Sequence, residues 1–187
     1  ADSKSPYYEH TLYTRGVSLL QMKNIEHALE ILRFLSELPP TDDERQSILD
    51  ETHLTLGYVY YEMGYFKDAL SHFQTVSPSS RKHPDALLAA GWTEASQKNW
   101  SKAVSVLTVL YKNYKNSHQI SESLFLLGRC YLKLGKYDNA VDIYKYLLEH
   151  HQDMQSTAER DSLQEKLLFE KERIRERKME LLSLESK

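Results

Sequence analysis

A glycine followed twelve residues later by an alanine recurs four times in this chain of 187 residues. The pairs are Gly16 with Ala28, Gly57 with Ala69, Gly91 with Ala103, and Gly128 with Ala140. The offset inside each pair is constant, whereas the interval from one pair to the next varies between 34 and 41 residues. Self-similarity at such a period is typical of proteins built as a row of similar supersecondary units. The chain is therefore expected to be a stack of repeats.

Large apolar residues keep a fixed register around these pairs and indicate helices. Four residues after each alanine stand Leu32, Phe73, Leu107 and Tyr144. Spacings of three and four residues are those of amphipathic helices, and no strand-like alternation of any length is present. A glycine inside a helix costs about 1 kcal/mol relative to alanine. Its recurrence therefore predicts a close approach of two antiparallel helices at the glycine and the alanine. The predicted helix pairs are 7–21 with 24–37, 47–63 with 66–77, 84–97 with 100–114, and 119–134 with 137–150.

The unequal intervals between copies predict local insertions. The first interval, from Gly16 to Gly57, predicts about two extra helical turns or a longer loop around "PPTDDERQS". The last interval, from Gly91 to Gly128, predicts a helix that is longer by nearly one turn.

This register resembles the tetratricopeptide repeat, whose signature is W-x2-L-G-x2-Y, then A-x3-F, then P. The stretches "LGYVYYEMGYFKDA" at 56–69 and "LGRCYLKLGKYDNA" at 127–140 match it best. Arg15 and Glu94 depart from it, because the family has apolar residues at these positions. The resemblance covers residues 7–152 and implies an all-α fold, a right-handed superhelix of about four helix-turn-helix repeats plus a C-terminal helix.

The tail, residues 153–187, is highly charged and is predicted to form that C-terminal helix. Ser156 and Glu159 have the spacing of a capping box. A narrow apolar seam is formed by Leu163, Leu167, Ile174 and Leu181. Two roles stay open. The helix either caps the open end of the repeats, which need a polar outer face, or protrudes and mediates self-association with another chain.

Composition and motifs exclude several classes of function. The formal net charge of −3 argues against a nucleic-acid partner, which normally requires a basic surplus. No apolar run approaches the ~18 residues of a membrane-spanning helix. The single cysteine, Cys130, excludes a multi-cysteine metal site. Hydrolase, phosphate-binding and zinc-protease motifs are missing, and the His residues are scattered. We expect a protein that is no enzyme and has no metal or cofactor.

The resemblance also implies a binding surface, because the first helix of each unit lines the concave groove in this family. The groove positions lie three before the glycine and one, four and five after it. The partner-binding residues expected on this basis are Tyr13, Tyr58, Tyr61, Trp92, Phe125, Arg129 and Lys133. Aromatic residues with an arginine are typical of interface hot spots. The alternative is that these side chains only pack against neighbouring helices.

The expected function is a non-catalytic scaffold or adaptor that binds an apolar peptide or helix of a protein partner. One alternative is an obligate subunit of a larger assembly, including one in a cell envelope. Another is a regulatory binding domain of a larger enzyme or receptor. The elongated units are similar to those of bacterial cell-envelope repeat proteins, which implies the bacterial periplasm. A cytoplasmic setting is the alternative.

Overall fold

The computed structural model describes residues 7–150 and, in the tail, 168–169, 172–173, 175–176 and 179. The long elements are α1 (Tyr8–Gln21), α2 (Ile25–Ser36), α3 (Asp43–Glu62), α4 (Phe66–Thr75), α5 (His83–Ser96), α6 (Trp100–Asn113), α7 (Ile120–Lys133) and α8 (Tyr137–His150). None of the described residues lies in a strand, so the prediction of an all-α fold is confirmed. The largest error in the predicted bounds is at α3, which begins four residues earlier than expected.

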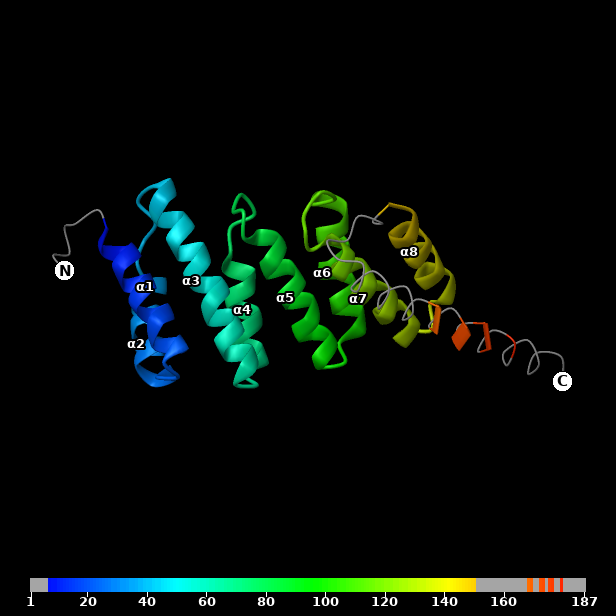
Figure 1. Ribbon diagram of the computed structural model, residues 1–187, viewed down its shortest axis with the longest axis horizontal. Coiled ribbons are helices and arrows are strands. Elements are labelled where there is room, and N and C mark those ends of the chain that lie inside the picture. The colour runs from blue at the N-terminus through cyan, green and yellow to red at the C-terminus, as the bar shows by residue number, and fades with distance from the viewer. Residues whose placement is uncertain (1–6, 151–167, 170–171, 174, 177–178, 180–187) are drawn as a thin grey trace. The chain divides into compact units, whose positions relative to one another are not determined.

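The chain divides into two compact units, whose helices are labelled in Figure 1. The first unit, residues 1–97, holds α1 to α5, and the second unit, residues 98–187, holds α6 to α8. In the first unit α1 pairs with α2 and α3 with α4, while α1, α3 and α5 are successive neighbours. In the second unit α7 contacts both α6 and α8. The predicted division into a repeat domain and a tail at residue 152 stays a prediction, since most of 151–187 lies outside the described residues.

Three of the recurring glycines, Gly16, Gly57 and Gly128, make room for a large side chain on the paired helix. A Cβ atom on Gly57 would lie 2.5 Å from Cδ1 of Phe73, and one on Gly128 would lie 2.5 Å from Cζ of Tyr144. Gly16 meets Leu32 in the same way. These partners all stand four residues after the repeat alanine. The sequence placed the closest approach at the alanine, whereas the glycine contacts the bulky residue one turn further on.

The turn inside each helical pair has a residue with positive φ at one register position, seven residues after the glycine. These residues are Lys23 (φ 59°), Gly64 (78°), Lys98 (62°) and Gly135 (71°). After Lys23, Gly64 and Gly135 the next residue donates its N–H to a carbonyl five residues back, for example Tyr65 N to Tyr60 O at 2.8 Å and Asn24 N to Leu19 O at 2.9 Å. This is the Schellman pattern of a left-handed helix end. It reverses the chain within a few residues.

The unequal intervals come from helix length. The helix α3 has 20 residues where α1 has 14, and the extra residues lie at its N-terminal end. Asp42 caps that end by accepting a hydrogen bond from Arg45 N at 2.8 Å, and Arg45 also pairs with Glu9 of α1. The first interval is therefore longer mainly because α3 is a longer helix than α1. The prediction for the last interval is confirmed, because α6 has 14 residues where α4 has 10.

Candidate partner-binding faces

In the first unit, tyrosine hydroxyl groups connect α1 to α3 and α3 to α5. Tyr13 of α1 is half-buried, and its hydroxyl lies 3.2 Å from Thr55 Oγ1 of α3. Tyr61 of α3 is also half-buried, and its hydroxyl lies 3.0 Å from Ser96 Oγ of α5. Each pair of hydroxyls joins the first helices of two successive helical pairs. These two tyrosines therefore hold α1, α3 and α5 in register as well as standing at expected groove positions.

Tyr58 has a different environment from the other two tyrosines. It remains 45% exposed on α3, with its ring edge-on to Phe73 at a centroid distance of 5.4 Å. Leu54, one turn earlier on the same helix, is buried. Trp92 on α5 is half-buried. Four of the expected residues thus lie on neighbouring helices of the first unit, and Tyr58 offers the largest exposed aromatic surface among them.

The remaining three expected residues lie on α7 of the second unit. Phe125 is half-buried, 6.2 Å from the Tyr144 ring, and the Arg129 guanidinium lies 6.0 Å from the Phe125 ring centroid. Arg129 and Lys133 are exposed one turn apart. This face combines an aromatic ring with two positive charges. Such a face suits an acidic or carboxylate-ended segment that also carries an apolar side chain.

Cys130 lies behind this face and is fully buried. Burial raises the pKa of its thiol to about 11, although the charge of Arg129 works in the opposite direction. A thiol with such a pKa is almost entirely protonated at neutral pH and is a poor nucleophile. Cys130 is therefore a buried thiol that contributes to packing.

A cluster of rings on α3 and α4 was missed by the sequence reasoning. His53 Nδ1 lies 3.0 Å from His72 Nδ1, and the His72 ring is stacked on Tyr60 at a centroid distance of 5.3 Å. Burial lowers the pKa of His72 to about 4 and also lowers the pKa of His53. The two imidazoles are therefore neutral at pH 7 and pack as aromatic rings. Within the described part of the chain, no group of three or more His, Cys, Asp or Glu side chains is placed to hold a metal ion.

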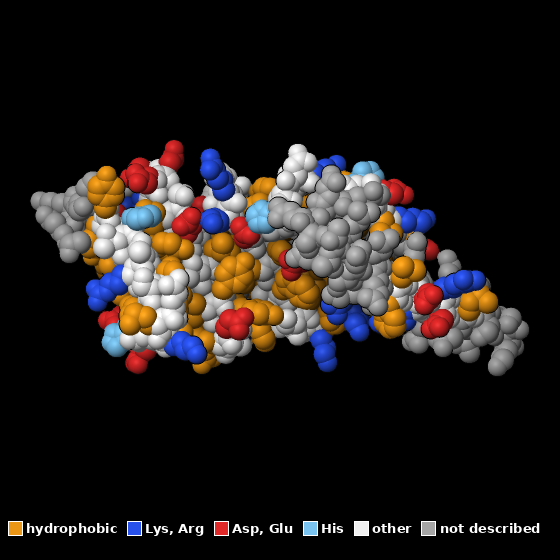
Figure 2. Space-filling view, viewed as in Figure 1, with side chains coloured by type: hydrophobic (Ala, Val, Ile, Leu, Met, Phe, Trp, Pro, Cys, Tyr) orange, Lys and Arg blue, Asp and Glu red, His pale blue; other side chains and the backbone are white. Residues whose placement is uncertain are grey.

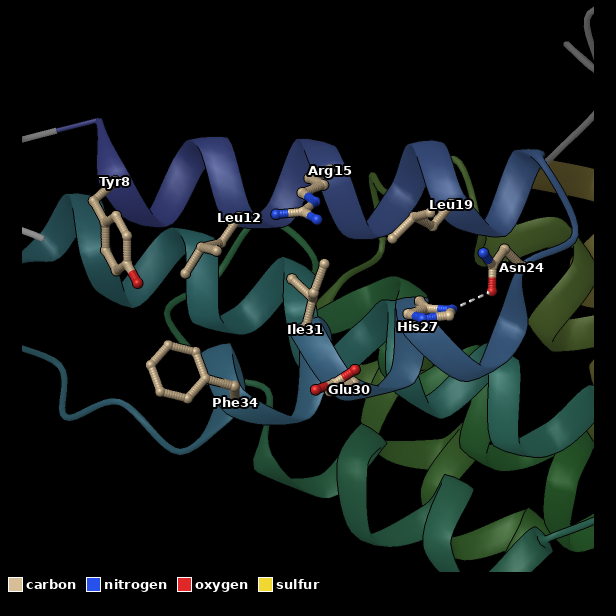
Figure 3. A pocket seen from close by; sticks show the side chains of 9 residues that line it. All are labelled: Tyr8, Leu12, Arg15, Leu19, Asn24, His27, Glu30, Ile31 and Phe34. Carbon is tan, nitrogen blue, oxygen red and sulfur yellow. Dashed lines mark hydrogen bonds between the residues drawn. The ribbon is translucent and has the colours of Figure 1, made fainter. Parts of the chain in front are cut away.

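A cavity of about 650 Å³ opens between α1 and α2 on the outer side of this pair (Figure 3). The helix α1 contributes Tyr8, Leu12, Arg15 and Leu19. The helix α2 contributes His27, Glu30, Ile31 and Phe34, and Asn24 lies at the turn. We call this surface the end face. Its sequence signal is a second apolar stripe on each helix, which cannot be distinguished from a buried stripe without the structure.

The described helices have no feature of a membrane span, since none is both long and apolar enough to cross a bilayer. Figure 2 shows hydrophobic side chains reaching the surface of the first unit between acidic and basic ones.

Comparisons with known proteins agree on a helical repeat. Residues 64–147 match the family described as anaphase-promoting complex, cyclosome, subunit 3. Superkiller protein 3 of Schizosaccharomyces pombe is 25% identical over 123 residues, which are 65% of this chain and 9% of that protein. The chain thus spans a small part of the curated relative it matches.

Solved structures share the fold at low sequence identity. MamA superposes with a TM-score of 0.61 at 19% identity, covering 80% of this chain and 81% of that one. A thermophilic TPR protein of Thermus thermophilus has a TM-score of 0.55 at 20% identity, covering 89% of this chain and 84% of that one. At these identities the likeness concerns the fold alone.

Proposed function

We infer that this chain, which belongs to the tetratricopeptide-repeat family, is a non-catalytic scaffold that binds an apolar peptide or helix of another protein. Repeats of this fold generally mediate protein–protein interactions. The proposal here is narrower. It assigns the binding to the exposed surfaces of α3, α5 and α7, the first helices of their pairs, which we call the first-helix faces. Tyr58 and Trp92 are the anchors on the first unit, and Phe125 with Arg129 are the anchors on the second.

The observation that carries the proposal is the exposure of Tyr58. Its ring is 45% exposed although it stands on a helix whose neighbouring positions, Leu54 and Gly57, are buried. The edge contact with Phe73 holds the ring in place, so little side-chain entropy would be lost on binding. A positioned aromatic ring that is open to solvent is a favourable hot spot, because a partner can bury it at low cost.

The second unit supports a charged anchor beside the apolar one. Arg129 and Lys133 are exposed, and Phe125 lies beside Arg129. A partner segment with an acidic residue next to an apolar one would satisfy both. Peptide-sized contacts of this kind often have micromolar affinity, about −8 kcal/mol.

A role as an obligate subunit of a larger assembly is the second candidate. The family that matches residues 64–147 is described as a subunit of a multi-protein complex. In this case the same faces would be covered permanently by a neighbouring subunit, and the isolated chain would expose apolar surface that promotes association.

The experiment that tests the proposal compares two double variants with matched controls. Tyr58→Ala with Trp92→Ala alters the first unit, and Phe125→Ala with Arg129→Ala alters the second. Each is used as bait against extracts of the source organism, and the partners captured by the parent protein are quantified by mass spectrometry. We expect at least one double variant to capture the same partners about tenfold less well, with helicity by circular dichroism unchanged.

The controls are Lys67→Ala on the first unit and Lys102→Ala on the second, both at exposed positions. They should capture partners as the parent does. If both double variants also retain parental capture, the binding surface lies elsewhere and the proposal is wrong.

A further inference from the structure

In the first unit, the face of α3 that is equivalent to the end face of α1 is covered by a neighbouring helix. Shifting the register by one repeat places Tyr8, Arg15 and Leu19 at the positions of Leu49, Leu56 and Tyr60 on α3. Those three residues are 4%, 0% and 7% exposed, because α2 packs over them. On α3 this face is therefore a helix-packing surface.

On α1 and α2 the same face is open, and in the first unit no other described helix lines it. Phe34 is 49% exposed there, and Leu12, Leu19 and Ile31 are only half-buried. Figure 3 shows the apolar side chains of both helices around one depression, with Arg15 on α1 and Glu30 on α2. The face is thus apolar with one charge of each sign.

The two charges have no counter-ion among the described residues. Arg15 and Glu30 are both exposed, and neither takes part in an ion pair with another described side chain. They lie at about the same height along the antiparallel pair, because Gly16 of α1 faces Leu32 of α2. A two-fold axis parallel to these helices would lay α1 of one copy over α2 of another. Arg15 of each copy would then meet Glu30 of the other.

We propose that the end face is a self-complementary interface, through which two copies of this chain associate about a two-fold axis. In an isologous contact each residue pair occurs twice. The charges therefore form two Arg15–Glu30 pairs, while Leu12, Leu19, Ile31 and Phe34 of the two copies bury one another. A partner whose charged residues all have the same sign would leave either Arg15 or Glu30 without a counter-ion. This is why a second copy fits the face better than a uniformly acidic or basic helix.

Sedimentation velocity of the full-length chain, from about 1 µM to about 500 µM, tests this interface. The parent protein should show a reversible monomer–dimer equilibrium. Arg15→Glu and Glu30→Arg should each weaken the dimer by about tenfold or more, because like charges then face each other twice. An equimolar mixture of the two variants should associate again, since one copy supplies two acidic groups and the other two basic groups.

Matched controls reverse single charges elsewhere on the first unit, with Glu62→Arg on α3 and Lys67→Glu on α4, both exposed. They should dimerise as the parent does, and circular dichroism should show that all variants are folded. A parent that stays monomeric throughout, or a dimer that ignores the Arg15 and Glu30 reversals, overturns the proposal. So does a dimer that is lost only when residues 157–187 are removed, because the tail is then the interface. Partner capture by the Arg15→Glu variant should stay parental, which separates this proposal from that for the first-helix faces.

Discussion

Arg33 of α2 donates a hydrogen bond of 2.6 Å from Nε to the hydroxyl of Tyr60 on α3, and its guanidinium carbon lies 5.4 Å from the centroid of the same ring. This contact joins the first helical pair to the second. The same Tyr60 ring is stacked on the His72 imidazole of α4 at a centroid distance of 5.3 Å. Three residues, Arg33, Tyr60 and His72, thus link α2, α3 and α4.

We expect this contact to be measurable in a double-mutant cycle. Tyr60→Phe removes only the hydroxyl, and Arg33→Ala removes both the donor and the cation. Hydrogen bonds that involve a charged group contribute about 1.5–3 kcal/mol when well formed, and partial exposure lowers this. A coupling free energy of about 1 kcal/mol is therefore expected from urea unfolding. Strict additivity of the two variants would show that the contact contributes nothing to stability.

The glycine that faces Phe73 should not tolerate a side chain. Gly57→Ala would place a Cβ atom 2.5 Å from Cδ1 of a ring that is 3% exposed. The ring has no room to move away, so we expect a loss of about 1–3 kcal/mol in the free energy of unfolding. Adding Phe73→Leu should not remove the clash, because a Cβ atom on Gly16 would also lie 2.6 Å from Cδ2 of the facing Leu32. If Gly57→Ala melts at the parental temperature, the helices of this pair are not as close as described.

The left-handed turn position offers a stabilising change. Lys23 has φ 59°, whereas Gly64 and Gly135 occupy the equivalent positions in other pairs. A non-glycine residue there costs about 1–2 kcal/mol, partly offset by the lower entropy of its unfolded chain. Lys23→Gly should therefore raise the stability by about 0.5–1 kcal/mol in thermal unfolding.

Gly64→Ala is the reverse change and should lower the stability. Its new Cβ atom would meet no atom within 4 Å, so only the positive φ opposes it. Equal melting temperatures for Gly64→Ala, Lys23→Gly and the parent would contradict the backbone assignment of these turns.

The N-terminal cap of α3 predicts a dependence on acid pH. The backbone N–H of Arg45 and then the hydroxyl of Thr41 lower the pKa of Asp42 below its usual 3.8. The folded state therefore binds a proton less readily than the unfolded state. The contribution is fully present above pH 3.8 and is lost as the pH falls through the folded pKa. Denaturant unfolding should show that the stability of Asp42→Asn depends less on pH than that of the parent between about pH 4 and about pH 2. An identical pH profile would show that the cap is absent in solution.

The buried thiol predicts slow chemistry at Cys130. With a pKa of about 11, only about one thiol in a thousand is ionised at pH 8, and the group is also inaccessible. A thiol reagent such as dithionitrobenzoate should label the folded protein only at the rate of unfolding. The labelling should become immediate in denaturant. Rapid labelling under native conditions would contradict the burial of Cys130 on α7.

The repeat register could be predicted from sequence because steric needs confine particular positions to small residues. A side chain on Gly57 would meet the Phe73 ring, Ala69 is fully buried, and bulky residues follow at fixed offsets. The turns were harder to predict. Lys23 and Lys98 adopt the same positive φ as Gly64 and Gly135, but a lysine does not indicate this conformation in the sequence. The bonds of Tyr13 to Thr55 and of Tyr61 to Ser96 depend on the stagger between neighbouring helices. Sequence periodicity does not specify that stagger.

The exposure of the end face could not be predicted from the sequence either. Leu12, Leu19 and Ile31 follow a helical spacing that is equally suited to a buried stripe. Only the packing shows that no other described helix of the first unit lines the cavity beside Leu19 and Ile31, and that Arg15 and Glu30 lie at one height. Leu12 also packs against the core cluster of Leu35, Ile48 and Leu49.

Binding of a partner by the first-helix faces can be tested by hydroxyl-radical footprinting of the chain with and without its captured partner. The method reports the solvent exposure of individual aromatic side chains. We expect Tyr58, with Trp92 or Phe125, to become about twofold or more less reactive in the complex, while Tyr65, 54% exposed in the turn before α4, keeps its reactivity. Unchanged reactivity at Tyr58, Trp92 and Phe125, with protection confined to other residues, would contradict the assignment of binding to the first-helix faces.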